Sequence, residues 1–309
     1  MKRIIVNIMI TTGLVFILTG LIIIRRDDIN TLINKYLSPN RNVELTEKNE
    51  YYRDYDFKYV QNTDDFNPSS FQDLLNIYYT VINSGSEMFT FYCDNEYTEC
   101  GQDISTIAND KGLLSDINNF VHPYNAYSNI ETEYDSLGKV TIKLTRNYKS
   151  DEIKKINEKV DELYKELATS DNVRDNIKNI HDYIINNSKY DSNRSDNGIE
   201  DYRSDIAYGP LFEGYAICGG YTDLMQLFLE KMNLKSYRVS SESHIWNAVE
   251  IDNKWYHIDL TWDDPVVDDG KDYLKHDYFL VTTKELVEKE KTQHIFNQKR
   301  FIEVKEANS

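Results

Sequence analysis

The sequence predicts an α+β fold with one main core, a small α+β module in front of it and an apolar N-terminal segment. Three observations carry this prediction. Residues 218–232 have the apolar spacing of a buried helix, residues 244–261 alternate as two paired strands, and residues 4–24 are almost entirely apolar. We expect the helix to pack on the antiparallel sheet that the two strands begin.

The N-terminal segment is long enough to cross a bilayer as a helix. A cleaved signal peptide has a shorter apolar run and a small-residue cleavage motif, whereas Arg25 follows directly here. We therefore expect an uncleaved single-pass anchor over residues 1–25, with a cleaved signal as the alternative. Lys2 and Arg3 favour an N-terminus inside the cell, although Arg25 and Arg26 compete with them. An acidic domain that follows a single N-terminal anchor is most often exported. We therefore expect the part of the chain after the anchor to be extracellular.

The next two segments differ in their apolar content. Residues 26–69 are polar and acidic with little periodicity, and we interpret them as a stalk. Residues 70–150 predict the small α+β module. Its expected elements are a helix over 71–82, a strand over 88–93, a helix over 114–121 and a hairpin of strands 130–135 and 140–148.

The largest predicted unit, residues 151–309, begins with two amphipathic helices. Ser150 is expected to cap the first helix, and the second is expected over 172–186. A third helix follows Cys218, so this thiol should lie at a helix start. The unpaired amides and the dipole there favour an anion, which lowers a thiol pKa and supplies a nucleophilic thiolate.

Two strands after this helix carry a histidine and an aspartate. Asp252-Asn253 is a two-residue hairpin signal that pairs Ile251 with Lys254. This register pairs Trp246 with Asp259 and His244 with Thr261. His244 and Asp259 are then diagonal neighbours on one face, close enough for their side chains to meet. A thiol, an imidazole and a carboxylate in this arrangement indicate acyl transfer through a thioester.

These motifs resemble the transglutaminase-like superfamily, whose core is papain-like. The matching stretches are Cys218-Gly219-Gly220-Tyr221, His244-Ile245-Trp246-Asn247 and Asp259-Leu260-Thr261-Trp262-Asp263-Asp264-Pro265. The resemblance covers residues 170–309 and, more loosely, 70–150. It implies that Cys218 is the nucleophile, His244 the base and Asp259 the residue that orients the imidazole. Ile217 departs from the Gly-Val that precedes the cysteine in many relatives.

An oxyanion donor is also required for acyl transfer. The backbone amide of Cys218 is one candidate by position. Because family members use an upstream aromatic or amide side chain, the resemblance also implies Tyr190, with Tyr183 as the alternative. The loop at 208–211 is expected to form the cleft and residues 278–281 a closing strand. His181 and His294 are polar residues to which the sequence assigns no role.

Several alternatives remain open from the sequence. The chain is either an active cysteine peptidase or acyltransferase, or a catalytically idle member of the same fold that binds a peptide or cell-envelope ligand. A metal hydrolase built from His244, His257, Asp259 and Asp263 would need outward-facing and inward-facing residues to converge. We expect no cofactor and no metal, and we interpret His257 as structural.

Charge and cysteine content narrow the partners. The net charge of −17 and pI of about 4.8 exclude nucleic acid as a natural partner and favour a cationic or neutral protein or peptide substrate. Cys93 and Cys100 are either a disulfide, consistent with an oxidising exterior, or two free thiols. The oligomeric state does not follow from the sequence.

Overall fold

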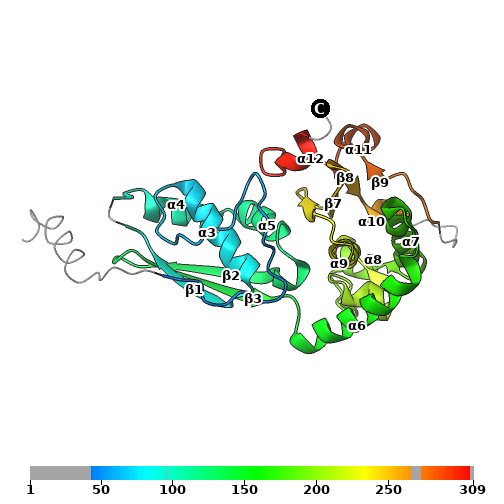
Figure 1. Cartoon of the computed structure of the whole chain (residues 1–309), viewed down its shortest axis with the longest axis horizontal. Coiled ribbons are helices and arrows are strands. Elements are labelled where there is room, and N and C mark those ends of the chain that lie inside the picture. The colour runs from blue at the N-terminus through cyan, green and yellow to red at the C-terminus, as the bar shows by residue number, and fades with distance from the viewer. Residues whose placement is uncertain (1–42, 95, 266–272, 307–309) are drawn as a thin grey trace, which may run out of the picture.

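The computed structural model describes residues 43–94, 96–265 and 273–306, which form two lobes side by side (Figure 1). The predicted anchor at residues 4–24 and the first part of the predicted stalk, residues 26–42, lie outside these ranges. Among the helices of the described ranges, none combines the length and the apolar character needed to span a bilayer.

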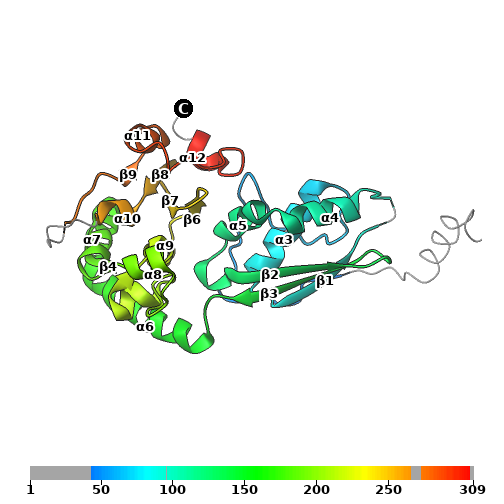
Figure 2. The same cartoon turned by 180° about the vertical axis from the view of Figure 1, so that it is seen from behind.

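The N-terminal lobe is a three-stranded antiparallel sheet covered by helices. Its strands β1 (Met88–Tyr92), β2 (Tyr127–Tyr134) and β3 (Lys139–Arg146) lie in the order β1-β3-β2. Helices α3 (Phe71–Ser84), α4 (Cys100–Asn109) and α5 (Lys111–Asn119) lie on one face of this sheet, as Figures 1 and 2 show. The helix over 71–82, the strand over 88–93 and the hairpin are confirmed.

Two features of this lobe differ from the prediction. Helix α4 was not expected, because its segment holds few apolar residues besides Cys100, Ile104 and Ile107, all of which are buried. Helix α5 begins earlier than residue 114, since the Asp110 side chain accepts a hydrogen bond from the Leu113 amide and caps the helix. Cys93 and Cys100 form a disulfide, which ties the end of β1 to the start of α4.

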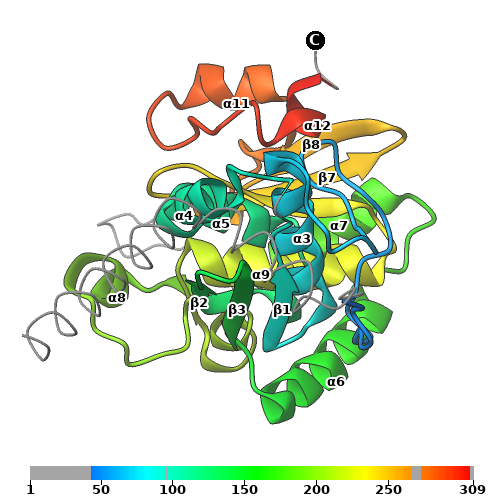
Figure 3. The same cartoon turned by 90° about the vertical axis from the view of Figure 1, so that its left-hand side faces the viewer.

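The C-terminal lobe contains a four-stranded antiparallel sheet in the order β6-β7-β8-β9. In Figure 3 helix α9 lies beneath this sheet, and α11 and α12 lie above it. The elements in chain order are α6 (Ser150–Leu167), α7 (Val173–Asn186), β4 (Lys189–Tyr190), α8 (Ser192–Asn197), a π-helical turn (Gly209–Glu213), β5 (Tyr215–Ala216), α9 (Cys218–Lys231), β6 (Ser236–Ser240), β7 (Ile245–Ile251), β8 (Lys254–Ile258), α10 (Leu260–Asp263), β9 (Phe279–Val281), α11 (Thr283–Lys289) and α12 (Ile302–Glu306).

The first helices of this lobe follow the predicted pattern with one correction. Ser150 is the first residue of α6 rather than its cap. The cap position belongs to Lys149, whose backbone amide donates to the Glu152 carboxylate at 2.9 Å. Asn172 caps α7 by accepting from the Arg174 amide, as the second predicted helix requires.

The β7–β8 hairpin has the predicted register over its ladder. Ile251 pairs with Lys254 and Ala248 with His257, and the turn residues Asp252 and Asn253 have φ of 55° and 60°. Strand β8 ends at Ile258, however, so the predicted pairs beyond it do not form. The chain leaves the strand there because Asp259 caps helix α10 instead of continuing the ladder.

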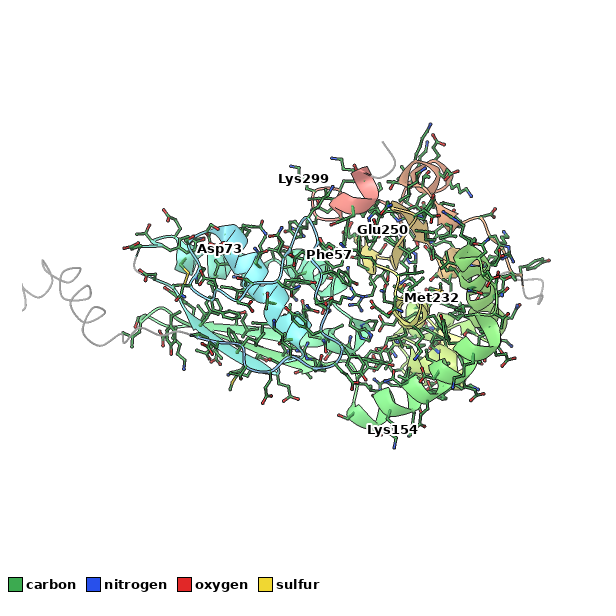
Figure 4. The ribbon with its side chains drawn as sticks, in the orientation of Figure 1. Phe57, Asp73, Lys154, Met232, Glu250 and Lys299 are labelled. Atoms are coloured by element: carbon green, nitrogen blue, oxygen red, sulfur yellow. A yellow bond between two sulfur atoms is a disulfide. The ribbon has the colours of Figure 1, made fainter. Side chains whose placement is uncertain are left out.

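The stalk interpretation is wrong for the part of residues 26–69 that packs against the lobes. Phe57, Val60 and Phe66 are buried in the main core. Phe57, labelled in Figure 4, lies where the two lobes meet and contacts Tyr237 of β6 edge-to-face at 5.4 Å between ring centroids. The polar composition of this segment hid its few anchoring aromatic residues.

Polar contacts also join the lobes at buried positions. Arg53, which is 4 % exposed, forms an ion pair with Glu230 of α9 and donates to the Phe120 carbonyl. Ser240 of β6 contacts both Asp116 and Asn119 of α5, at 3.0 and 2.7 Å. The N-terminal lobe therefore packs against α9 and against β6, the edge strand of the C-terminal sheet.

Candidate active site

Helix α9 begins at Cys218, as the sequence predicted, and the loop before it determines this position. Its first turn packs directly on the backbone of residues 204–205. A Cβ atom at Gly219 would lie 2.7 Å from the Asp205 carbonyl oxygen, and one at Gly220 would lie 2.3 Å from the Ser204 oxygen. The Ile217 amide donates to the same Ser204 oxygen at 2.8 Å. The two glycines therefore permit a close approach that fixes where the thiol lies.

Strand β7 is docked on α9 by the asparagine of the His-x-Trp-Asn motif. The Asn247 side-chain amide donates to the Thr222 carbonyl at 3.0 Å and to the Gln226 Oε1 at 3.1 Å. In return the Thr222 hydroxyl donates to the Ile245 carbonyl, next to His244, at 3.0 Å. These buried bonds hold the strand that carries the histidine at a fixed position relative to the helix that carries the cysteine.

His244 lies between Cys218 and Asp259. Its Nε2 is 2.6 Å from Asp259 Oδ2, and Cys218 lies near enough to help raise the pKa of the ring. Because Nε2 faces the carboxylate, Nδ1 is the ring nitrogen left for the thiol. The prediction that the His244 and Asp259 side chains meet is confirmed. The Cys218 side chain is a free thiol at a partly exposed position, so it is open to a substrate from solvent.

The electrostatics favour a charged imidazole in this position. Burial acts to lower the pKa of His244, but the Asp259 carboxylate and then Cys218 outweigh it and raise this pKa to about 10. For Asp259 burial acts to raise the pKa, and the charge and hydrogen bonds of His244 and His294 bring it below its usual value. The pair is therefore an imidazolium and a carboxylate at neutral pH.

Asp259 uses both of its oxygens. Oδ1 accepts from the amides of Thr261 and Trp262, at 3.0 and 3.3 Å, and this caps α10. Oδ2 accepts from His244 and also from His294 Nε2 at 2.8 Å. The helix cap and the imidazole contact are thus made by the same side chain. The cap prevents the carboxylate from rotating away from His244.

His294 is the residue that sequence reasoning left without a role. It follows Asp259 by 35 residues, in a segment with no motif and no regular secondary structure. Its ring is fully buried and stacks on Tyr278 at 5.2 Å between centroids, with Trp246 and Trp262 also in contact. The aromatic residues at 246, 262 and 278 were the only signal of a buried polar side chain between them.

The proposed metal quartet does not assemble. His257 accepts from the Trp246 indole at 2.9 Å through Nδ1 and contacts Thr283 through Nε2 at 3.0 Å. Burial and then the charge of His294 lower the pKa of His257 to about 3, so it is neutral and structural. Asp263 instead contacts His181 at 3.1 Å. These four side chains therefore share no common centre.

Within the described ranges, two other groups have converging ligand atoms. One is His244, Asp259 and His294, and the other is His181, Asp182 and His276. The first group contains His244 and Asp259, which the sequence analysis placed with Cys218, whereas the second group contains none of those residues.

Tyr190 lies close to Cys218, but its hydroxyl has another partner. Strand β4 pairs in parallel with β5 and places Tyr190 beside Ala216, two residues before the cysteine. The hydroxyl donates to the Ser195 Oγ at 3.3 Å. Burial and then the charge of Cys218 raise the pKa of Tyr190, so the phenol stays protonated and able to donate. Tyr183 lines a surface hollow between α6 and α7.

Comparison with known proteins identifies the family of this chain. The family profile of the transglutaminase-like domain matches residues 137–295, just over half of the chain and including all three motifs. No curated protein matches the sequence. Two solved structures are similar at 16 % identity: a protein described as a TGase, with a TM-score of 0.33, and a proposed cysteine protease from Cytophaga hutchinsonii, with a TM-score of 0.28.

These similarities are partial in both directions. The alignment with the TGase covers 44 % of this chain and 45 % of that protein. The alignment with the Cytophaga protein covers 43 % and 61 %. The chain thus spans less than two thirds of either structure, and the family assignment rests on the profile match alone. By that match, this chain belongs to the transglutaminase-like domain family.

Proposed function

We propose that the protein is a thiol-dependent enzyme that hydrolyses or transfers the acyl group of a peptide or carboxamide through Cys218, His244 and Asp259. One observation carries the proposal: His244 contacts a buried carboxylate at 2.6 Å, and the free thiol of Cys218 lies near enough to the same imidazole to raise its pKa. This is the geometry that activates a thiol nucleophile.

The reaction would proceed in two halves. The Cys218 thiolate attacks the carbonyl carbon, and the His244 imidazolium gives its proton to the leaving amine as the thioester forms. An amine or water then attacks the thioester while His244 accepts its proton, and the thiolate leaves. Asp259 keeps its charge and holds the ring in both halves.

The backbone amide of Cys218 is our first candidate for the oxyanion donor, with Tyr190 as the second. This amide lies in the first turn of α9, where backbone N–H groups have no acceptor within the helix.

We propose further that the enzyme is attached to the cell membrane by residues 4–24 and acts outside the cell on a protein or cell-envelope peptide. The Cys93–Cys100 disulfide supports an oxidising compartment. The net charge of −17 supports a cationic or neutral substrate. Protease added to intact cells should then remove the catalytic region and leave an N-terminal peptide in the membrane. Protection of the region until lysis would reverse the orientation.

The central experiment compares wild type with Cys218→Ala by mass spectrometry. An electrophilic thiol probe should modify the wild-type Cys218, and an amine donor with a peptide carboxamide acceptor should give a cross-linked product. Both signals should vanish in the variant. Probe labelling without turnover of any peptide library would favour the catalytically idle, ligand-binding alternative, and loss of neither signal would exclude Cys218 as the nucleophile.

A further inference from the structure

A second cluster of histidine and carboxylate groups lies near the outer surface, on α7 and on the segment before β9. His181 Nδ1 is 3.0 Å from Asp182 Oδ1, and His276 Nε2 is 2.6 Å from the same oxygen. These three ligand atoms lie within 4.8 Å of one another. His181 is fully buried, whereas the His276 side chain is 35 % exposed, so the cluster has one side open to water.

The buried side of this cluster orients His181. Its Nε2 lies 3.1 Å from Asp263 Oδ2, and both side chains are fully buried. Asp263 is itself fixed, because its Oδ1 accepts from the Tyr278 amide at 2.9 Å and its carbonyl accepts from the Lys275 amide at 2.8 Å. A carboxylate that holds one imidazole N–H leaves the other nitrogen as a lone-pair donor, the arrangement found behind metal-bound histidines.

We propose that His181 Nδ1, Asp182 Oδ1 and His276 Nε2 bind a divalent transition-metal ion of the Zn²⁺ type, with Asp263 supporting His181. Two imidazoles and one carboxylate are a common zinc ligand set, and the water-facing side leaves a fourth position open. Ligands 2.0–2.1 Å from a tetrahedral ion lie about 3.3 Å apart, so each imidazole nitrogen needs to move away from Asp182 Oδ1 by less than about 1 Å.

One neighbouring cation competes with this ion. The Lys178 ammonium lies 2.6 Å from Asp182 Oδ2 on the same helix. Its side chain is 46 % exposed, so it can turn into water when the ion binds. The competition gives the proposal an unusual signature, because removal of Lys178 should strengthen metal binding instead of leaving it unchanged.

Metal binding at this place would connect three parts of the C-terminal lobe. It would join α7 to the segment that contains His276, and it would hold α10 through Asp263. Because α10 is the helix that Asp259 caps, the ion would help to hold in place the helix to which this carboxylate is bonded. The inference concerns residues outside the proposed catalytic site, and it stands whether or not that site is active.

The test uses the full-length protein, purified in detergent and freed of metal with a chelator. Calorimetry measures its titration with Zn²⁺, and the absorption spectrum of bound Co²⁺ reports the coordination geometry. Wild type should bind one ion with a tetrahedral Co²⁺ spectrum, His276→Asn should weaken binding more than about 100-fold, and Lys178→Ala should strengthen it. Asp175→Asn, a change of a carboxylate elsewhere on α7, is the control and should have no effect.

A second comparison separates this site from the catalytic cluster. His244→Asn should still bind one Zn²⁺ with wild-type affinity, because His244 belongs to the other group of converging ligands. Binding that is lost in His244→Asn and kept in His276→Asn would overturn the proposal, as would a wild-type protein that binds no Zn²⁺ or one whose affinity does not respond to His276→Asn.

Discussion

Replacement of Asp259 by asparagine tests the electrostatic basis of the site. The carboxylate is the largest of the influences that raise the pKa of His244, which stands at about 10 against an ordinary value of 6.5. Asparagine is nearly the same size as aspartate but has one acceptor oxygen instead of two. It therefore cannot accept hydrogen bonds both from the Nε2 atoms of His244 and His294 and from the α10 amides. We therefore expect the pKa of His244 to fall, because burial, which lowers it, remains while the largest raising influence is lost.

The consequences for rate and stability can be estimated. Loss of the orienting carboxylate should lower the acyl-transfer rate by about 10⁴-fold at neutral pH. Because the folded pKa of His244 is raised and that of Asp259 is lowered, their pairing stabilises the fold fully between pH 3.8 and 6.5 and loses this effect as pH rises through about 10. The stability difference between wild type and variant, on the order of 3 kcal/mol, should shrink over that rise.

The assay is NMR titration of the His244 ring, combined with thermal melts from pH 5 to pH 10. Cys218→Ala is the matched control, because the thiol contributes less than Asp259 to the pKa of His244. It should lower this pKa by less than Asp259→Asn does. A His244 that titrates identically in wild type and Asp259→Asn would refute the reasoning, as would a rate that falls less than tenfold.

Four further outcomes follow from single contacts. Without reductant, iodoacetamide should label Cys218 alone, since Cys93 and Cys100 are paired in a disulfide. Cys218→Ser should abolish this labelling, and modification of all three cysteines would contradict the disulfide. His294→Gln should lower kcat by about 10- to 100-fold with little change in KM, because one hydrogen bond to a charged carboxylate contributes a free energy of that size. An unchanged pH–rate profile in this variant would show that His294 does not position Asp259. His257→Asn should instead reduce the free energy of unfolding by about 1–3 kcal/mol and kcat by less than tenfold, because its neutral ring supports Trp246 and not the reacting groups. A large loss of kcat with unchanged stability would place His257 in the site. Arg53→Met should lower the free energy of unfolding, measured by chemical denaturation, by about 3 kcal/mol, because it leaves the Glu230 carboxylate without its cation. Adding Glu230→Leu should recover most of that loss. An Arg53→Met variant as stable as wild type would mean that residues 43–69 are not part of the folded body.

The sequence alone determined the elements around the proposed nucleophile. The spacing of apolar residues after Cys218 predicted α9, and Asp252-Asn253 predicted the turn and register of the β7–β8 hairpin. Both depend on interactions between near neighbours in the chain: helix periodicity repeats within four residues, and a two-residue turn fixes which strand residues face each other. The contact between His244 and Asp259 was predicted from an extension of this register that does not form, since the ladder ends at Ile258 and Asp259 reaches His244 as the cap of α10.

Tertiary structure decided everything that depends on distant segments. Whether Phe57 belonged to a linker or to the core depended on a partner, Tyr237, far along the chain. His294 reached Asp259 only because residues after β9 return to the site, and His181 met His276 only because the segment before β9 passes beside α7. Side chains of this kind carry no local pattern, since the free energy that orders them comes from burial between elements that meet only in the folded chain.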